Sequence, residues 1–262
     1  MLVISACSTP KPVTTTSNDA SQENGIVTNG KLFTALFQQQ AAEYKALCFQ
    51  AYNMARLKVA QETQTAASGK KLAIVTDIDE TVLDNSPVAV KEGLRGQDFN
   101  QNSWYDWTSK SNADTVPGAP SFLKYAASKG IVIFYITNRD EKERAVTLVN
   151  LQKYNLPNAD NEHLFLRQNT SSKETRRQVV LAQHEIIMLI GDNLSDFSSL
   201  FDKKTIQERN DNVTQLAGEF GNRFIVLPNP NYGDWENSVY KYNYNLTEQQ
   251  KDSVIKTVLK SF

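Results

Sequence analysis

Short, almost uninterrupted apolar runs alternate with amphipathic stretches along most of the chain. Five such runs stand out, the last of them weaker: "LAIVTDI" at 72–78, "IVIFYIT" at 131–137, "IIMLIGD" at 186–192, "RFIVLPN" at 223–229 and "HLFLR" at 163–167. Near-continuous apolar strands are typical of a parallel sheet covered on both faces. Between them helical spacing recurs at residues 119–129, 140–154, 173–184 and, in pieces, 195–220. The alternation predicts an α/β fold with a doubly wound, mostly parallel sheet.

Two further helical elements are predicted outside the alternating region. Residues 31–66 place apolar side chains at helical spacing, which predicts one long amphipathic helix, and Gly69 suits its stop. The C-terminal stretch 246–262 opens with Thr247, a capping-type residue, and continues as an amphipathic helix.

The connection between the first and second predicted strands is too long for an ordinary loop. Its residues 85–118 hold aromatic side chains among Asn, Gln and Ser, and they are interpreted as an inserted lid. We therefore expect the core at about residues 70–84 and 119–245, with the lid between them and the helical elements around them.

Composition bounds the function classes. The chain has 262 residues, 40% of them hydrophobic, which is enough for one sizeable core. Lys+Arg is 28 and Asp+Glu is 29, so the formal net charge is −1, and no basic run occurs. These features argue against a polymeric nucleic acid partner. No apolar stretch approaches the roughly 20 residues that span a bilayer.

The N-terminus "MLVISACSTP" resembles the end of a bacterial lipoprotein signal, in which the cysteine, here Cys7, is lipidated after cleavage. Residues 1–7 are interpreted as the remnant of that signal and the polar residues 8–30 as a disordered tether. The expected location is the bacterial cell envelope, as an outer-membrane lipoprotein or in the periplasm. The alternative is an ordinary N-terminus with an unrelated cysteine. With Cys7 lipidated, Cys48 is expected to be a buried free thiol.

Polar side chains gather where the apolar runs end. Ligands of open α/β sheets bind beyond the carboxyl ends of the strands, so these side chains are expected to meet at one rim. They are Asp77, Asp79, Thr137, Asn138, Asp192 and Asp196, together with Lys173 just before a predicted helix.

The chemistry of this set points to phosphate and a metal ion. Asp77 and Asp192 with a backbone carbonyl suit a hard divalent ion such as Mg²⁺, and Lys173 adds positive charge that attracts phosphate. One carboxylate is able to act as a covalent nucleophile. A second carboxylate two residues away is able to move protons, and Thr137 with nearby amides is able to hold phosphoryl oxygens.

The motifs Asp77-x-Asp79-x-Thr81, Thr137, Lys173 and Gly191-Asp192-x-x-x-Asp196 resemble, in order and context, the four motifs of the haloacid dehalogenase (HAD) superfamily. The longer strings "IVTDIDETVLDNS" and "GDNLSDF" are similar to class C acid phosphatases, the lipoprotein e type of 5′-nucleotidase. The resemblance implies a HAD-like Rossmannoid core and an acid phosphatase domain over residues 31–262. One departure is Val88, where the family pattern has tyrosine.

The resemblance also implies roles for individual residues. Asp77 is the expected nucleophile and Asp79 the general acid and base. The expected Mg²⁺ ligands are Asp77, Asp79 through its carbonyl, Asp192 and Asp196, and the expected phosphate ligands are Thr137, Asn138 and Lys173. The implied activity is Mg²⁺-dependent hydrolysis of phosphomonoesters, nucleoside 5′-monophosphates in particular, through an aspartyl-phosphate. Glu80 and Asp84 are expected to have structural roles.

Aromatic residues suggest how a leaving group is held. Trp104 of the lid and Tyr232 after the fourth main apolar run are candidates to sandwich a flat group, with simple packing of the lid as the alternative for Trp104. Trp107 and Trp235 are predicted to pack in the core, whereas Arg176 and Arg177 are predicted to be solvated.

Three other functions stay open at this stage. A phosphotransferase or a broad sugar and aryl phosphatase would use the same site. A surface lipoprotein that binds ligands is an alternative of another class, although it would need no second aspartate at position 79.

Overall fold

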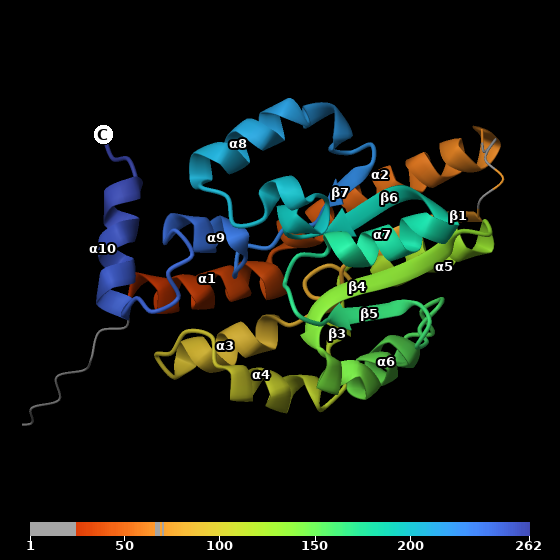
Figure 1. Cartoon of the computed structure of the whole chain (residues 1–262). Helices are drawn as coiled ribbons and strands as arrows, with labels where there is room; N and C mark the ends of the chain where they lie inside the picture. The colour runs from red at the N-terminus through yellow and green to blue at the C-terminus, as the bar shows by residue number, and fades with distance from the viewer. Residues whose placement is uncertain (1–24, 66–68, 70) are drawn as a thin grey trace, which may run out of the picture.

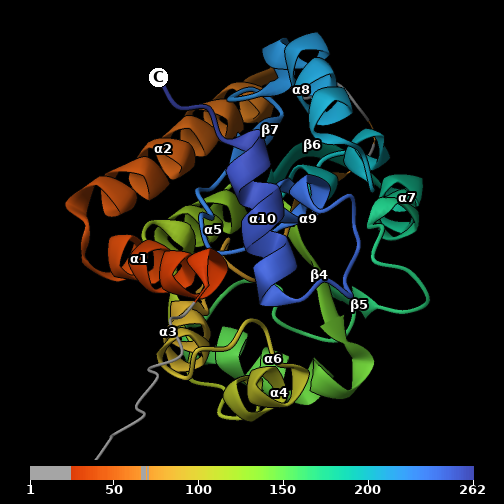
Figure 2. The ribbon, with the colours of Figure 1, turned by 90° about the vertical axis from the view of Figure 1, so that its left-hand side faces the viewer.

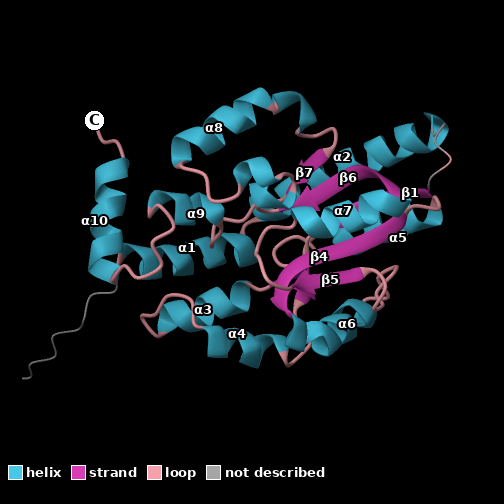
Figure 3. Ribbon diagram, in the orientation of Figure 1, coloured by secondary structure: helices cyan, strands magenta, loops and turns pink. Residues whose placement is uncertain are grey.

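The computed structural model describes residues 25–65, 69 and 71–262, and these residues contain one main sheet of five strands. The strands are β1 Lys71–Thr76, β4 Val132–Asp140, β5 Leu164–Arg167, β6 His184–Gly191 and β7 Phe224–Val226. Their order is β5-β4-β1-β6-β7, and every neighbouring pair is parallel (Figures 1 and 3). The predicted doubly wound α/β fold is therefore confirmed.

Helices cover both faces of this sheet. In chain order the α-helices of the described residues are α1 Ile26–Gln40, α2 Ala42–Thr65, α3 Ser86–Leu94, α4 Gln101–Thr108, α5 Ala119–Ser128, α6 Arg144–Lys153, α7 Glu174–Gln183, α8 Ile206–Gln215, α9 Asp234–Val239 and α10 Glu248–Val258. Figure 2 shows α2 and α5 on one side of the sheet and α7 on the other. Within the part that the structure describes, no helix is both long and apolar enough to cross a membrane.

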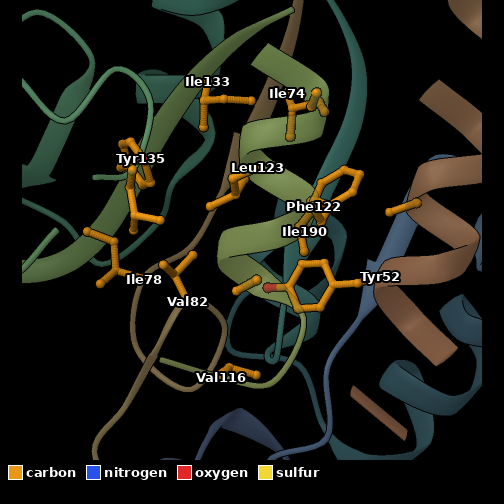
Figure 4. Packing of buried hydrophobic residues seen from close by; sticks show 14 of the residues in the cluster. Tyr52, Ile74, Ile78, Val82, Val116, Phe122, Leu123, Ile133, Tyr135 and Ile190 are labelled. Atoms are coloured by element: carbon orange, nitrogen blue, oxygen red, sulfur yellow. The ribbon is translucent and has the colours of Figure 1, made fainter. Parts of the chain in front are cut away.

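The core between α2, α5 and the sheet is apolar and closely packed. Figure 4 shows Ile74 of β1 and Ile133 of β4 pointing toward Phe122 of α5. The intervening residues of the strands, such as Val75 and Phe134, face the second cluster under α7. Because consecutive side chains of a strand point to opposite faces, burial of both faces explains the nearly continuous apolar runs.

The segment predicted as one long helix is two helices that meet at Ala41, whose backbone is extended at φ −79° and ψ 125°. The two helices bury their side chains in different places, because α1 packs against α3 and α2 packs against α5. Residues 26–30, predicted as part of the tether, already belong to α1. Cys7 and residues 8–24 lie outside the described residues. Cys48 is buried and has no disulfide partner among the residues that the structure describes.

The segment predicted as a lid contains α3, α4 and the strand β3 Asp114–Thr115. This strand pairs with β2 Leu83–Asp84 in a small antiparallel sheet of two strands. Asn100 caps α4 by accepting from the amides of Asn102 and Ser103. Figure 1 shows α1, α3, α4, α9 and α10 beyond the carboxyl ends of the strands. These elements therefore frame the place where open α/β sheets bind ligands.

The first and last helices are joined at this end of the molecule. The amide of Ile26 donates to Asp252 Oδ1 over 2.9 Å, and Thr28 Oγ1 donates to Glu248 Oε1 over 2.9 Å. Thr247 caps α10 as predicted, in a capping box with Gln250. The rim of the sheet thus contains elements from both ends of the described chain.

Tyr52 ties α2 to the loop that follows β1. Its ring is 3% exposed and lies 5.5 Å from that of Phe122, and its hydroxyl donates to the carbonyl of Thr81 over 2.5 Å. In Tyr52→Phe this buried carbonyl loses its partner, which typically costs about 1–3 kcal/mol. We expect denaturant unfolding to show a loss of that size in the free energy of unfolding. An unchanged midpoint would show that the hydrogen bond contributes nothing to stability.

Candidate active site

Asp77 stands immediately after β1, in the middle of the sheet. Its amide donates to the carbonyl of Ile190 on β6 over 2.8 Å, so the strand pairing continues to this residue. At Glu80, the residue directly after Asp79, the backbone enters the left-handed region with φ 59°, and the chain turns back to pair Asp79 with Leu83. The turn leaves both aspartates at the carboxyl end of the central strand.

Lys173 lies among carboxylates from two strand ends. Its Nζ contacts Asp77 Oδ1 and lies 2.6 Å from Asp196 Oδ1, and all three side chains are less than a tenth exposed. Burial lowers the pKa of the Lys173 ammonium, but Asp196 and Asp77 outweigh burial and hold this pKa above its ordinary value. The lysine is therefore charged, as a phosphate site requires.

Asp77, Asp192 and Asp196 form a cluster that is able to hold a metal ion. Each offers a carboxylate oxygen, and these oxygens all lie within 4.8 Å of one another. Burial, and then the charge of Asp196, raises the pKa of Asp192 to about 7, and burial raises the pKa of Asp77 well above its usual range. Oxygen ligands that repel one another in this way fit a hard divalent cation.

Gly191 makes room for this cluster. A Cβ at Gly191 would lie 2.3 Å from Asp196 Oδ2 and 2.5 Å from Asp196 Cβ, so any larger residue would displace the aspartate. The side chain of Asp196 is fixed by the amide of Asn193, which donates to Oδ2 over 3.0 Å. Asp192 accepts from Thr81 over 3.0 Å and from Asn229 over 2.8 Å.

The carboxylate of Asp79 lies outside the metal cluster and is held by donors from β4 and the lid. Arg139 donates to Asp79 Oδ1 from Nε over 3.0 Å and from Nη2 over 2.7 Å. Asn85 Nδ2 donates over 2.9 Å and Thr137 Oγ1 over 3.2 Å. Sequence reasoning missed Arg139, although a partly buried acid two residues from the nucleophile candidate requires a cationic or donor partner.

Asn138 is oriented by Arg176 of α7. Arg176 Nη2 donates to Asn138 Oδ1 over 2.7 Å, and Arg176 Nη1 donates to the carbonyl of Thr137 over 2.6 Å. Since a guanidinium only donates, it binds the amide oxygen of Asn138 and leaves the amide NH₂ of this exposed residue for the cleft. A donor group is thereby placed in the cleft that Lys173 also lines.

The prediction that Arg176 and Arg177 are solvated is wrong, since they are 7% and 3% exposed. Arg177 donates to the carbonyls of Ser195 and Asp196 over 3.1 and 2.8 Å. Helical position alone suggests a surface residue, but the carbonyl of Thr137 in β4 and carbonyls of the loop after β6 face this side of α7 and accept from the two arginines. The two arginines therefore connect the end of β4, which carries phosphate candidates, with the loop that carries metal candidates.

Trp104 and Tyr232 both line one cleft at this site, of about 790 Å³. Trp104 Nε1 donates to Glu143 Oε1 over 3.0 Å, which fixes its ring, and Tyr232 is 38% exposed. Trp107 packs against the core as predicted. The prediction for Trp235 is wrong, because its side chain is 47% exposed; its Nε1 donates to the carbonyl of Tyr232 over 3.1 Å.

Glu80 connects the turn after β1 to α1. It is 1% exposed and accepts from the amide of Asn85 over 3.1 Å and from Gln38 Nε2 over 2.7 Å, which agrees with the predicted structural role. Asp84 similarly accepts from the amide of Ser86 over 2.8 Å. Burial raises the pKa of Glu80 to about 8, with a further contribution from Asp84.

A parallel sheet that brings two aspartates of one strand end together with a threonine, a lysine and two further aspartates defines a phosphatase site of the HAD type. The chain belongs to the HAD superfamily, subfamily IIIB (acid phosphatase), whose family model matches residues 5–235. Members of this family are phosphoric monoester hydrolases, so the prediction of an enzyme of this class is confirmed.

Solved structures agree with this family. The chain is 42% identical to the class C acid phosphatase from Bacillus anthracis, with a TM-score of 0.86 over 90% of this chain and 99% of that one. The tungstate-bound structure of the Bacillus anthracis enzyme matches with the same identity and TM-score over 98% of its chain. The predicted resemblance to class C acid phosphatases is thereby confirmed.

A plant relative is more distant. The stem 31 kDa glycoprotein of Glycine max is 30% identical over 161 residues, which are 59% of this chain. The aligned region spans 57% of the length of that relative.

The raised pKa values predict how stability depends on pH in the absence of metal. For Glu80 and Asp192 they are about 8 and about 7, so between about pH 8 and 5 the folded state binds more protons than the unfolded state. Stability then rises as the pH falls. We expect the thermal midpoint in EDTA to increase as the pH falls from about 8 to 5, and to increase less steeply in Glu80→Gln. A midpoint that increases toward pH 8 would contradict these pKa directions.

Arg176 provides a test of how the phosphate candidates are positioned. Arg176→Lys keeps a positive charge but cannot reach Asn138 and the carbonyl of Thr137 together. We expect kcat/KM for a phosphomonoester to fall about tenfold or more, since misplaced donors stabilise a transition state poorly. Arg95→Lys, an exposed change of the same kind, is the control and should keep full activity. Full activity in folded Arg176→Lys would exclude the positioning role.

Proposed function

We propose that this chain is a Mg²⁺-dependent acid phosphatase that hydrolyses phosphomonoesters, nucleoside 5′-monophosphates in particular, through an aspartyl-phosphate on Asp77. The observation that carries the proposal is the position of Asp77. This carboxylate stands at the end of the central strand, lines the cleft, contacts Lys173 and belongs to the candidate metal cluster.

The reaction divides into two displacements at phosphorus. A carboxylate oxygen of Asp77 attacks the phosphorus atom, the bond to the leaving oxygen breaks, and Asp79 donates a proton to that oxygen. Asp79 then removes a proton from water, whose oxygen attacks the same phosphorus. The bond between phosphorus and Asp77 breaks, and inorganic phosphate and free Asp77 result. Arg139 and Asn85 hold the Asp79 carboxylate in place for both proton transfers.

The phosphoryl group requires donors and positive charge around it. Lys173, Thr137 and the NH₂ group of Asn138 are the candidates, and α7 supports two of them through Arg176. Mg²⁺ held by Asp77, Asp192, Asp196 and the carbonyl of Asp79 would neutralise charge on the phosphoryl oxygens. Tungstate, bound in the related Bacillus anthracis structure, is a tetrahedral oxyanion like phosphate, which supports a phosphate site here.

The choice of nucleotides depends on the two aromatic side chains of the cleft. Trp104 comes from the lid and Tyr232 from the loop after β7, so a flat base between them would contact rings from both. Stacking on an aromatic ring contributes about 1–3 kcal/mol per base and tolerates different bases. Leaving groups without such a ring would lose this contribution.

Cys7 supports a proposal for location. A lipid on Cys7, with the polar residues that follow as a tether, would place the enzyme at a bacterial envelope membrane, as an outer-membrane lipoprotein or in the periplasm. Its substrates there would be small phosphomonoesters outside the cytoplasm.

The decisive test measures phosphate release from nucleoside monophosphates, sugar phosphates and p-nitrophenyl phosphate at pH 5 to 8. We expect EDTA to abolish the activity and Mg²⁺ to restore it. Asp77→Asn should lower kcat by roughly 10³-fold or more, because it removes the nucleophile. Asp211→Asn, the same change on the exposed face of α8, is the matched control.

Each outcome of the panel separates the alternatives. Hydrolysis that favours sugar phosphates would exclude the base-stacking role of Trp104 and Tyr232 and would keep the mechanism. Faster leaving-group release than phosphate release in the presence of an added alcohol would identify a phosphotransferase. No turnover of any substrate would overturn the enzyme proposal in favour of a ligand-binding lipoprotein.

A further inference from the structure

Glu92 is a buried carboxylate without a partner in the wall of the cleft. It lies on α3, it is 2% exposed, and it is one of the residues that line the cleft that contains Asp77. Neither Oε1 nor Oε2 accepts a hydrogen bond from any residue that the structure describes. No role has so far been given to this residue.

The absence of a partner is unusual for a carboxylate at this depth. Glu80, which is equally buried, accepts hydrogen bonds from Gln38 and Asn85. A buried carboxylate that accepts none destabilises the folded state, because it has lost its hydration. The nearby lysine of the cleft, Lys31, contacts Asp98 instead.

The position of Glu92 on α3 shows what it faces. Val88, Ala89 and Glu92 line the cleft together, and their spacing places them on one face of the helix. Asn85, just before the helix, donates to Asp79 at the catalytic end. With a rise of 1.5 Å per residue, Glu92 lies roughly 10 Å farther along the helix axis than Asn85. In Figure 1, α3 runs away from the sheet.

We propose that Glu92 binds hydrogen-bond donors on the leaving group of the substrate, at the end of the cleft remote from the reacting phosphate. The inference rests on the proposed phosphatase function and deepens it. A carboxylate only accepts hydrogen bonds, so its ligand must carry hydroxyl or amino groups. The substrate class is therefore a phosphomonoester of a long leaving group with such donors, as nucleosides are.

The same geometry predicts strong selectivity. A buried site built to bind a donor rejects an analogue that lacks the donor, because the site is then left unpaired. Val88 and Ala89, which precede Glu92 on the same face, offer only apolar contact. Glu92 is thus the polar group of this helix face that is able to distinguish a hydroxylated leaving group from an aryl group of similar width.

The test compares Glu92→Met with the unaltered enzyme on adenosine 5′-monophosphate and on p-nitrophenyl phosphate. Methionine has a similar length and accepts no comparable hydrogen bond. We expect kcat/KM for the nucleotide to fall about tenfold or more, mainly through KM, and that for p-nitrophenyl phosphate to change less than about twofold. Glu43→Met, the same change at an exposed position of α2, should alter neither value.

Two further measurements identify the donor and control for folding. If Glu92 binds the sugar, the 2′,3′-dideoxy nucleotide is a poor substrate of the unaltered enzyme and loses nothing further in Glu92→Met. If Glu92 binds the amino group of the base, inosine 5′-monophosphate is the poor substrate of the unaltered enzyme and loses nothing further in Glu92→Met. The thermal midpoint of Glu92→Met should rise, because an apolar group replaces an unpaired carboxylate.

The results that overturn the two proposals differ. An equal loss on all substrates, or no loss on the nucleotide in a folded Glu92→Met, would overturn the role of Glu92 while p-nitrophenyl phosphate is still hydrolysed. Failure of the unaltered enzyme to hydrolyse p-nitrophenyl phosphate and nucleotides would overturn the phosphatase function and, with it, this inference.

Discussion

The buried ammonium group of Lys173 holds the carboxylates of Asp77 and Asp196 together at the ends of two neighbouring strands. Burial, and then the charges of neighbouring carboxylates, raises the pKa values of Asp77 and Asp192, and the positive charge of Lys173 opposes this shift. The lysine alone does not balance three carboxylates, which is why the cluster fits a divalent ion. The surplus negative charge of the carboxylates would repel an anionic substrate, so such a substrate is expected to bind only when Lys173 is charged and the divalent ion is bound.

The arginines of α7 extend this arrangement to the backbone. Arg176 binds the carbonyl of Thr137 near the end of β4, Arg177 binds carbonyls of the loop after β6, and Lys173 precedes them at the start of the same helix. One helix thus fixes the phosphate candidates, the metal candidates and the lysine between them relative to one another. Such rigidity suits a reaction in which the protein mainly positions groups and stabilises charge.

The sequence predicts the parts of this molecule that rest on local pattern. The five strands are visible as apolar runs because both faces of the sheet are buried, and the site follows from polar residues at the strand ends. The turn at Ala41 was not predictable, since it depends on which partners α1 and α2 find. The burial of Arg176 and Arg177 and the salt bridge of Arg139 were missed for the same reason, because tertiary contacts rather than helical or strand spacing determine them.

At the rim of the cleft, α1 is joined to α10 by the hydrogen bond from the amide of Ile26 to Asp252, two residues that are 226 positions apart in the chain. A rim of this kind cannot close during synthesis until nearly the whole chain has left the ribosome, so the sheet with its carboxylates forms before its cover. Since α10 has no buried residue, its release is also expected to be among the least costly local openings of the fold. Release of α10 would break its hydrogen bonds to Ile26 and Thr28 and remove Lys251 from the wall of the cleft.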